Sequence, residues 1–159
     1  MDIIKSENTV RKIKNGLSYF AKVYLTLRLT EKNILEIEEQ YQEQASSGFS
    51  QGQSESISSE GYSNWKQGIH NGIAYAYGKL TENCGLKVII ENATGLVTDT
   101  NPTIIGFSTS RAILDKLPND ESQSELELLE KMMYSSWNYE HGAIPDFVNK
   151  KIVGEKLTT

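Results

Sequence analysis

The segment from residue 85 to residue 117 constrains the fold more than any other part of the chain. Every second residue of 85–91 is apolar, which is the pattern of a strand with one buried face. Residues 92–95 contain Asn and Gly, which tolerate the left-handed backbone that a hairpin turn requires. Residues 96–98 can return as a short strand. We therefore predict a hairpin followed directly by a helix.

That helix has a clear start and a clear stop. Asn101 is a good N-cap, and Pro102 at the first helical position loses no hydrogen bond. The sequence predicts a helix from Pro102 to about Leu117, because residues 118–120 begin with a proline.

A second helix is predicted over residues 64–80, capped by Ser63 or Asn64. Large apolar side chains recur there every four residues, and they are Trp65, Ile69, Ile73 and Tyr77. Gly68 and Gly72 lie on one side of this helix, where they would permit the close approach of another helix or of a sheet.

The first third of the chain predicts strands. Residues 18–29 alternate and form a long, central strand, with a turn at Asn15-Gly16 before it. Residues 9–14 read either as an edge strand or as a short helix. Residues 34–37 favour the second strand of a hairpin that follows a turn at 30–33.

Residues 45–63 have a different composition, mostly Ser, Gly, Gln and Glu. Such a segment buries too little apolar surface to offset the entropy of ordering it. Two interpretations stay open: a mobile loop that orders on a partner through Phe49 and Tyr62, or plain disorder.

The C-terminal part, residues 118–159, predicts a helical extension and a tail. A third helix runs from about residue 121 to residue 134 or 137, and residues 143–159 form a short closing segment that frays. At 159 residues one domain is expected. The expected fold class is therefore α+β: a small mixed β-sheet with two helices packed on one face, plus the C-terminal extension.

The order of these elements resembles domain IV of translation elongation factor G, which has the ribosomal protein S5 domain 2-like fold. The resemblance covers about residues 17–117. It rests on a long strand at 21–29, a helix containing Gly68-Ile69, a strand at 87–91, and a helix entry at 99–101. It implies the same fold, and it raises association with RNA or the ribosome through Lys12, Lys14, Lys66 and Arg111. No phosphate-binding Gly-x-x-x-x-Gly-Lys-Ser/Thr loop is present in the sequence, so no GTPase is expected.

Charge argues against a broad nucleic-acid footprint, and we expect no DNA binding. The chain has 21 acidic and 16 basic residues and a net charge of −5. The basic residues gather near the N-terminus as Lys5, Arg11, Lys12, Lys14, Lys22 and Arg28. This asymmetry is either an interaction surface or simply one of two solvated faces.

Signals for catalysis are weak. His70 and His141 fall in different predicted elements, and no His-x-x-x-His pair suggests a metal site, so we expect no metal and no cofactor. Cys84 is the single cysteine, and a lone cysteine agrees with a reducing compartment. A small enzyme using His70 or His141 remains the last alternative.

No apolar run approaches the roughly 20 residues that span a bilayer, and the first residues have no signal-peptide layout. We therefore expect a cytoplasmic protein without membrane contact. Tyrosines favour interfaces, and Tyr75 and Tyr139 join Phe49 and Tyr62 as expected partner contacts. The leading hypothesis is a non-catalytic protein-binding module, such as an inhibitor, immunity or accessory protein, and a homodimer is possible.

Overall fold

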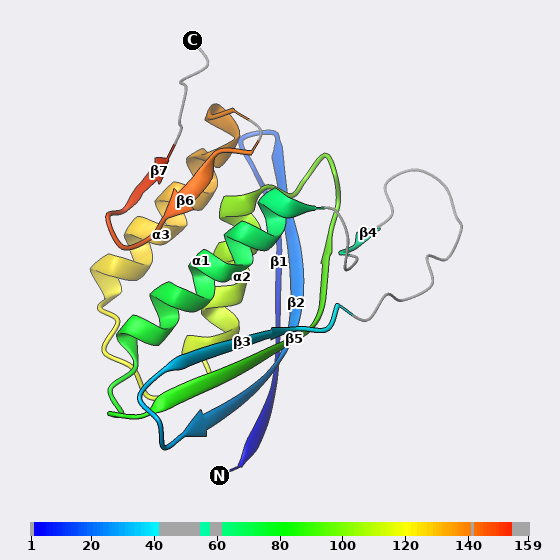
Figure 1. Cartoon of the computed structure of the whole chain (residues 1–159). Helices are drawn as coiled ribbons and strands as arrows, with labels where there is room; N and C mark the ends of the chain where they lie inside the picture. The colour runs from blue at the N-terminus through cyan, green and yellow to red at the C-terminus, as the bar shows by residue number, and fades with distance from the viewer. Residues whose placement is uncertain (1, 42–54, 58–61, 141, 154–159) are drawn as a thin grey trace.

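Four strands of the chain form a mixed sheet in the order β1-β2-β5-β3, the two-residue strand β4 adds to it as a fifth by pairing with the end of β5, and two helices cover one of its faces (Figure 1). The structure is a computed structural model, and it describes residues 2–41, 55–57, 62–140 and 142–153. The elements are β1 (Ile3–Lys14), β2 (Leu17–Thr30), β3 (Leu35–Glu39), β4 (Glu55–Ser56), α1 (Ser63–Lys79), β5 (Gly85–Gly95), α2 (Pro102–Leu114), α3 (Gln123–Ser135), the 3-10 turn η1 (Ser136–Asn138), β6 (Ile144–Asp146) and β7 (Lys151–Val153). This confirms the α+β class.

β1 and β2 form a long hairpin closed by the predicted turn. Asn15 and Gly16 have φ values of 53° and 78°, and the two strands then pair without interruption from Lys14–Leu17 to Ile3–Arg28. Two successive left-handed residues match the right-handed twist of the flanking strands. The edge-strand interpretation of residues 9–14 is confirmed, and the strand begins earlier, at Ile3.

The predicted turn at residues 92–95 is wrong, because β5 continues through it to Gly95. A register shift between Tyr24 and Leu25 leaves one extra residue, Glu91, on β5, so the irregularity there is a β-bulge rather than a turn. The central position of β5, with partners on both sides, outweighs the local preference of the turn residues. Gly95 is instead needed for space, since a Cβ there would lie 2.8 Å from the Trp65 ring.

The predicted hairpin between residues 18–29 and 34–37 is also wrong. β3 exists, but it pairs in parallel with β5, from Leu35–Leu86 to Glu39–Ile90, and β5 lies between β2 and β3. The turn between β2 and β3 therefore connects two strands that are not adjacent in the sheet. This insertion of β5 makes the sheet mixed.

The helix pair α1 and α2 packs through glycines, as the spacing of Gly68 and Gly72 predicts. A Cβ at Gly68 would lie 2.8 Å from the Cα of Pro102, and one at Gly72 would lie 3.1 Å from the carbonyl carbon of Gly106. The predicted side-chain cap of α1 is absent, because Tyr62 occupies the N-cap position in a left-handed conformation. The two backbones lie close enough to exclude a methyl group.

α2 starts as predicted and ends earlier. The Asn101 side chain accepts a hydrogen bond from the Ile104 amide at 2.9 Å, with Pro102 at the first position. The helix ends at Leu114, three residues before the predicted end at Leu117.

The C-terminal extension is only partly helical. α3 starts with a reciprocal capping box between Ser122 and Glu125. The segment predicted to close the chain contains the antiparallel hairpin β6–β7. Phe147, between these strands, is 2% exposed and packs edge-on against Tyr75 with ring centroids 6.0 Å apart. This hairpin therefore completes the helical side of the core.

Candidate interaction surface

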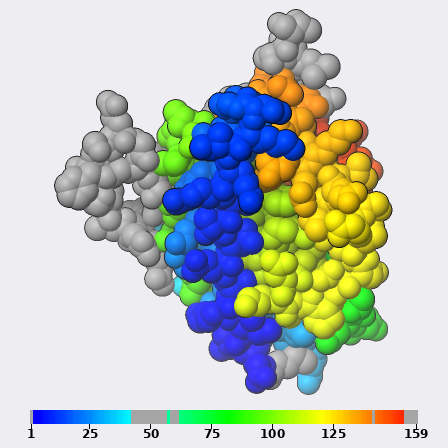
Figure 2. All heavy atoms as spheres, turned by 180° about the vertical axis from the view of Figure 1, so that it is seen from behind, coloured from blue at the N-terminus to red at the C-terminus, as the bar shows by residue number. Residues whose placement is uncertain are grey.

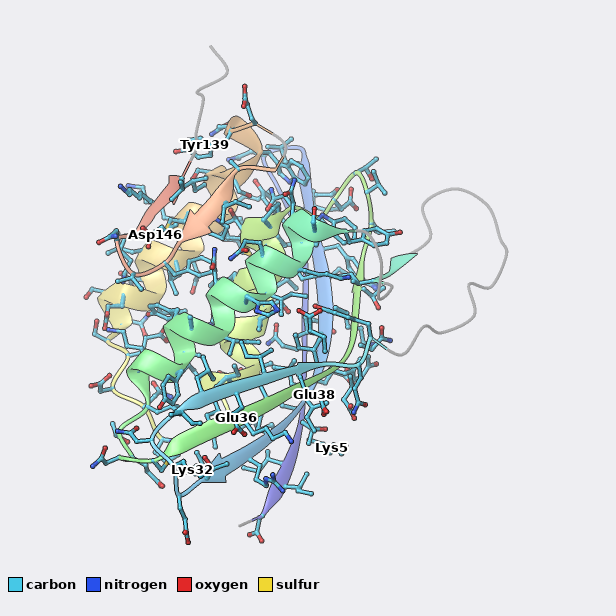
Figure 3. The ribbon with its side chains drawn as sticks, in the orientation of Figure 1. Lys5, Lys32, Glu36, Glu38, Tyr139 and Asp146 are labelled. Atoms are coloured by element: carbon cyan, nitrogen blue, oxygen red, sulfur yellow. The ribbon has the colours of Figure 1, made fainter. Side chains whose placement is uncertain are left out.

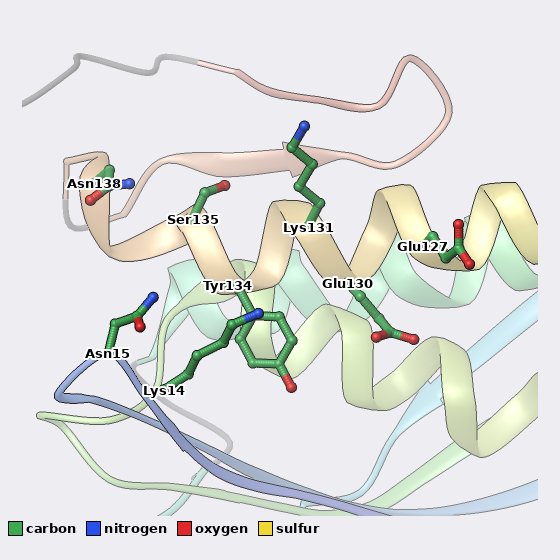
Figure 4. Close-up of a pocket in the computed structure, with 8 residues that line it drawn as sticks. All are labelled: Lys14, Asn15, Glu127, Glu130, Lys131, Tyr134, Ser135 and Asn138. Carbon is green, nitrogen blue, oxygen red and sulfur yellow. The ribbon is translucent and has the colours of Figure 1, made fainter.

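A groove lies between the end of the β1–β2 hairpin and α3 (Figure 4). Its volume is about 390 Å³. Lys14 and Asn15 line it from the hairpin, and the other lining residues come from α3 and the turn after it: Glu127, Glu130, Lys131, Tyr134, Ser135 and Asn138. We call this the hairpin–α3 groove.

Aromatic contacts fix one end of α3 against β2. The Tyr19 hydroxyl donates to the Tyr134 carbonyl at 2.7 Å, and the two rings meet edge-on with centroids 5.2 Å apart. The Trp137 ring nitrogen donates to the Ser18 carbonyl at 3.0 Å. Burial, followed by the nearby Tyr134, raises the pKa of Tyr19, which keeps its donating proton. These contacts hold the end of the hairpin–α3 groove in a defined shape.

Charge is unevenly distributed along this groove. The Lys14 ammonium lies 4.3 Å from the centroid of the Tyr134 ring, which places a cation beside Asn15 at the end near the hairpin turn. Glu127 and Glu130 lie on the part of α3 that is farther from that turn (Figure 4). Lys131 also lines the groove next to Glu130, and its side chain points away from Lys14 and Tyr134 in Figure 4. The groove therefore has a cation at the hairpin end, and two carboxylates and one ammonium farther along α3.

Apolar side chains are exposed at the tip of the same hairpin. Ile13 is 80% exposed and Leu17 is 42% exposed, on either side of the Asn15-Gly16 turn. Figure 2 shows β1, in dark blue, lying along the surface on this side of the molecule. Leu17 pairs with Lys14 and shares its face of the hairpin, whereas Ile13 pairs with Ser18 and points to the opposite face. Exposed apolar groups at such a tip are typical of contacts with another protein.

The sheet face opposite the helices is a second exposed surface. Lys5, Thr26, Ile89 and Glu38 form one row across the four strands. Figure 3 shows Lys5 on β1 and the acidic side chains of β3. Lys5 donates to Thr26 at 2.7 Å and pairs with Glu91 at 3.3 Å. We call this the open sheet face.

Two aromatic rings on the open sheet face lie beneath cations. The Arg11 guanidinium lies 5.2 Å from the Phe20 ring centroid, and the Lys22 ammonium lies 5.0 Å from that of Tyr24. Tyr24 raises the pKa of Lys22, which also lies 3.9 Å from Glu7. Phe20 is only 6% exposed, so its ring is already covered.

Tyr75 and Arg111, two predicted site residues, belong instead to a packing cluster. Tyr75 is 2% exposed and donates to Glu121 at 2.8 Å, and Arg111 donates to the other oxygen of that carboxylate at 2.8 Å. Burial, and then the hydrogen bond to Glu121, raise the pKa of Tyr75. This correction removes Tyr75 as a surface contact, because a buried side chain in α1 cannot reach a partner.

The same cluster extends to α3. The Lys79 ammonium contacts the Glu125 carboxylate, and this contact is the main reason that the pKa of Glu125 falls to about 2. Lys150 approaches Glu125 at 3.9 Å. Together these ion pairs fasten α3 and the β6–β7 hairpin to α1.

The remaining predicted partner contacts are scattered. Phe49 lies outside the described residues. Tyr62 stacks on Trp65 with centroids 5.1 Å apart at the start of α1. Tyr139 is half-buried after η1, beside Trp137 in a small depression.

The four cations predicted for RNA binding do not come together. Lys12 and Lys14 lie at the hairpin tip, Lys66 lies at the start of α1 over the Tyr41 ring at 4.9 Å, and Arg111 is paired with Glu121 near the end of α2. They form no continuous basic patch.

The predicted histidine pair cannot be assembled from the described residues. His141 lies outside them, and the His70 ring contacts the Glu39 carboxylate at the edge of the sheet. Within the described ranges, no group of three or more His, Cys, Asp or Glu side chains is placed to hold a metal ion.

Cys84 is half-buried just before β5. Among the described residues the Tyr41 hydroxyl is buried and has no hydrogen-bond partner, and burial raises its pKa.

Sequence reasoning missed the wall of the groove that α3 supplies. The sequence pattern indicates only a solvated helix face for Glu127, Glu130 and Lys131, because nothing in their spacing shows that a hairpin ends opposite them. The available signal was the Asn15-Gly16 turn, since the strand pattern on either side leaves Ile13 and Leu17 at its tip.

Comparisons with known proteins give a fold and no family. No family model matches the chain, and a search of curated proteins finds no match. Among solved structures, the chain is similar to the crystal structure of ttk003000868 from Thermus thermophilus, with 17% sequence identity and a TM-score of 0.51. The match covers 72% of this chain and 16% of that chain, so this chain corresponds to a small part of the larger protein. In the part of the chain that the structure describes, no helix is long and apolar enough to cross a membrane.

Proposed function

We propose that this chain is a non-catalytic, cytosolic protein-binding module that contacts its partner through the hairpin tip and the hairpin–α3 groove. The observation that carries the proposal is the exposure of Ile13 and Leu17 at the hairpin tip, where Leu17 shares the face of Lys14, which lines the groove, and Ile13 points to the opposite face. An inhibitor, an immunity protein or an accessory subunit would each use such a surface.

Several polar side chains away from the tip make structural hydrogen bonds within the protein, which leaves the tip as the better candidate for partner contact. Arg111 and Glu121 pair within the helical layer, and the Ser108 hydroxyl donates to the Asn8 side chain at 2.8 Å. The Thr100 hydroxyl donates to the Phe20 carbonyl. The Ser108 and Thr100 contacts hold α2 and the segment before it against the sheet, whereas Ile13 and Leu17 are exposed.

The test is affinity capture from a native lysate of the source cells, with ribonuclease present and absent. Wild-type protein is compared with the double variant Ile13→Ser/Leu17→Ser and with Val148→Ser. Val148 is 71% exposed in the β6–β7 connection, so its substitution is a matched loss of exposed apolar surface elsewhere. We expect a stoichiometric protein that resists ribonuclease, that Val148→Ser retains and that the hairpin variant loses. Equal capture of that protein by wild type and both variants would show that the hairpin tip does not contact the partner.

A second candidate function is association with RNA or the ribosome, and a specific observation favours it. β1 and β2 together contain one acidic residue, Glu7, and several basic residues. Arg11 and Lys22 are among the basic residues on the open sheet face, as is Lys5, which pairs with Glu91 of β5. The resemblance to domain IV of elongation factor G points to the same class of partner.

The salt dependence of binding tests this second candidate. Contacts to phosphates release counterions, so affinity for a ribosomal RNA fragment should fall steeply as salt rises. The double variant Arg11→Ala/Arg28→Ala should flatten that dependence. Binding that is absent, or that does not respond to salt, would rule the candidate out.

A further inference from the structure

We propose that the partner contributes an extended segment that adds to the free edge of β1 and lies in the hairpin–α3 groove. The segment would carry an acidic side chain beside Lys14 and a basic side chain beside Glu127 and Glu130. This inference rests on the proposed protein-binding function and specifies the form of the partner.

β1 offers an edge for such an addition. It is the terminal strand of the sheet, with β2 on one side and no strand of the described chain on the other. α2 reaches β1 at Ser6, whose hydroxyl donates to the Ala112 carbonyl, and at Asn8. At the turn end of β1, Lys14 lines the groove. A strand edge facing a helix across a groove is the arrangement in which peptides bind by strand addition.

The geometry of the groove sets the spacing of the two charges. Glu127 and Ser135 are eight residues apart on α3, so the groove extends about 12 Å along the helix at a rise of about 1.5 Å per residue. An extended chain rises about 3.4 Å per residue, and alternate side chains share a face. A pair of side chains four residues apart therefore spans the groove on one side of the added strand.

The direction of the added strand follows from pairing preferences. Antiparallel neighbours are the more common arrangement, so the added segment is expected to run opposite to β1. Its N-terminal half then lies near Lys14 and its C-terminal half near Glu127. The expected recognition pattern is an acidic residue followed four positions later by a basic residue, with β-forming residues between them.

The experiment uses the full chain and a phage-displayed library of fully random octapeptides. The library is sorted separately on wild-type protein and on the charge-swapped variant Lys14→Glu/Glu127→Lys. The matched control is Lys32→Glu/Glu36→Lys, which makes the same exchange at two exposed positions near β3. All three proteins have the same net charge.

We expect wild-type and control proteins to enrich peptides with an acidic residue four positions before a basic one, and the swapped variant to enrich the reverse order. A peptide from the wild-type selection should bind the swapped variant at least about fivefold more weakly. Hydrogen exchange should show new protection of β1 between Thr9 and Lys14 when that peptide is bound. Circular dichroism and thermal melting confirm that each variant is folded.

Three results overturn the proposal: no enrichment on wild-type protein, the same charge order on wild-type and swapped proteins, or bound peptide without protection of β1. The capture experiment separates this failure from failure of the proposed function. If Ile13→Ser/Leu17→Ser still loses a protein partner, binding at the tip stands and only strand addition is wrong.

Discussion

Two glycines of α1 should respond to the same substitution with opposite signs. Gly72 faces α2, where an added methyl would lie 3.1 Å from the Gly106 carbonyl carbon and 3.1 Å from the Thr109 Cβ. The Gly106 carbonyl oxygen would be closer still. Gly78, further along the same helix, has no neighbouring atom within 4 Å of an added Cβ.

The magnitudes follow from two competing effects. Alanine is favoured over glycine in a helix interior by about 1 kcal/mol; this gain applies in full at Gly72 and in part at Gly78, the second-to-last residue of α1. At Gly72 the methyl group must also push α1 away from the backbone of α2, and overpacking of this kind costs about 1–3 kcal/mol or more. Because the obstacle is backbone rather than a flexible side chain, we expect the upper part of that range.

Gly72→Ala should therefore lower the free energy of unfolding by about 1–2 kcal/mol, and Gly78→Ala should raise it by up to about 1 kcal/mol. For a chain of 159 residues, each kcal/mol corresponds to about 2–4 °C in Tm. Urea unfolding followed by circular dichroism, together with calorimetry, measures both quantities. If both substitutions stabilise the protein, α1 and α2 do not pack through backbone contact at Gly72, and the reasoning is refuted.

Three further predictions concern the core and its ion pairs. Asn101→Ala should destabilise the protein by about 1–2 kcal/mol in urea unfolding, because α2 loses its N-cap; an unchanged midpoint would contradict the role of that cap. Glu125→Gln should lower Tm at neutral pH, since the contact with Lys79 depresses the pKa of Glu125 from 4.5 to about 2. The difference in Tm between the variant and wild type should have its full size above about pH 4.5 and vanish as the pH falls toward 2. A difference in Tm that grows in acid would contradict this prediction. Tyr75→Phe should cost about 1 kcal/mol through the lost hydrogen bond to Glu121, whose two oxygens stay paired with Arg111, while leaving partner capture unchanged; loss of capture in a folded variant would return Tyr75 to the binding surface.

Local chemistry predicted the helices and the turn of the long hairpin well, because their signals are contained within a few residues, whereas residues 9–14 were left open between an edge strand and a short helix. Asn101 and Pro102 define the start of α2, and Asn15 with Gly16 defines the turn between β1 and β2. The glycine spacing of α1 predicted a close contact, and the structure supplies the contacting helix.

Strand pairing was predicted less well, because pairing depends on residues far apart in the sequence. Residues 92–95 carry turn residues, yet they continue β5, where Ala93 is fully buried. The short connection after β2 suggested a hairpin, yet β5 separates β2 from β3. In both cases the position of β5 between two partners decided the outcome, and no local pattern encodes which strand occupies the centre of a sheet.

The candidate site illustrates the same limit at the level of side chains. Tyr75 and Arg111 belong to residue types that favour interfaces, and each nevertheless serves the packing of α3 against the other helices. The hairpin tip was visible as a turn, but its neighbour across the groove lies more than a hundred residues later in the chain. The hairpin tip and α3 form one surface because Tyr19 of β2 anchors the end of α3. This contact holds the helix beside the hairpin and leaves the groove between them open. A function placed there depends on that anchoring, so a substitution that releases the end of α3 should impair binding even when Lys14 and Glu130 are intact.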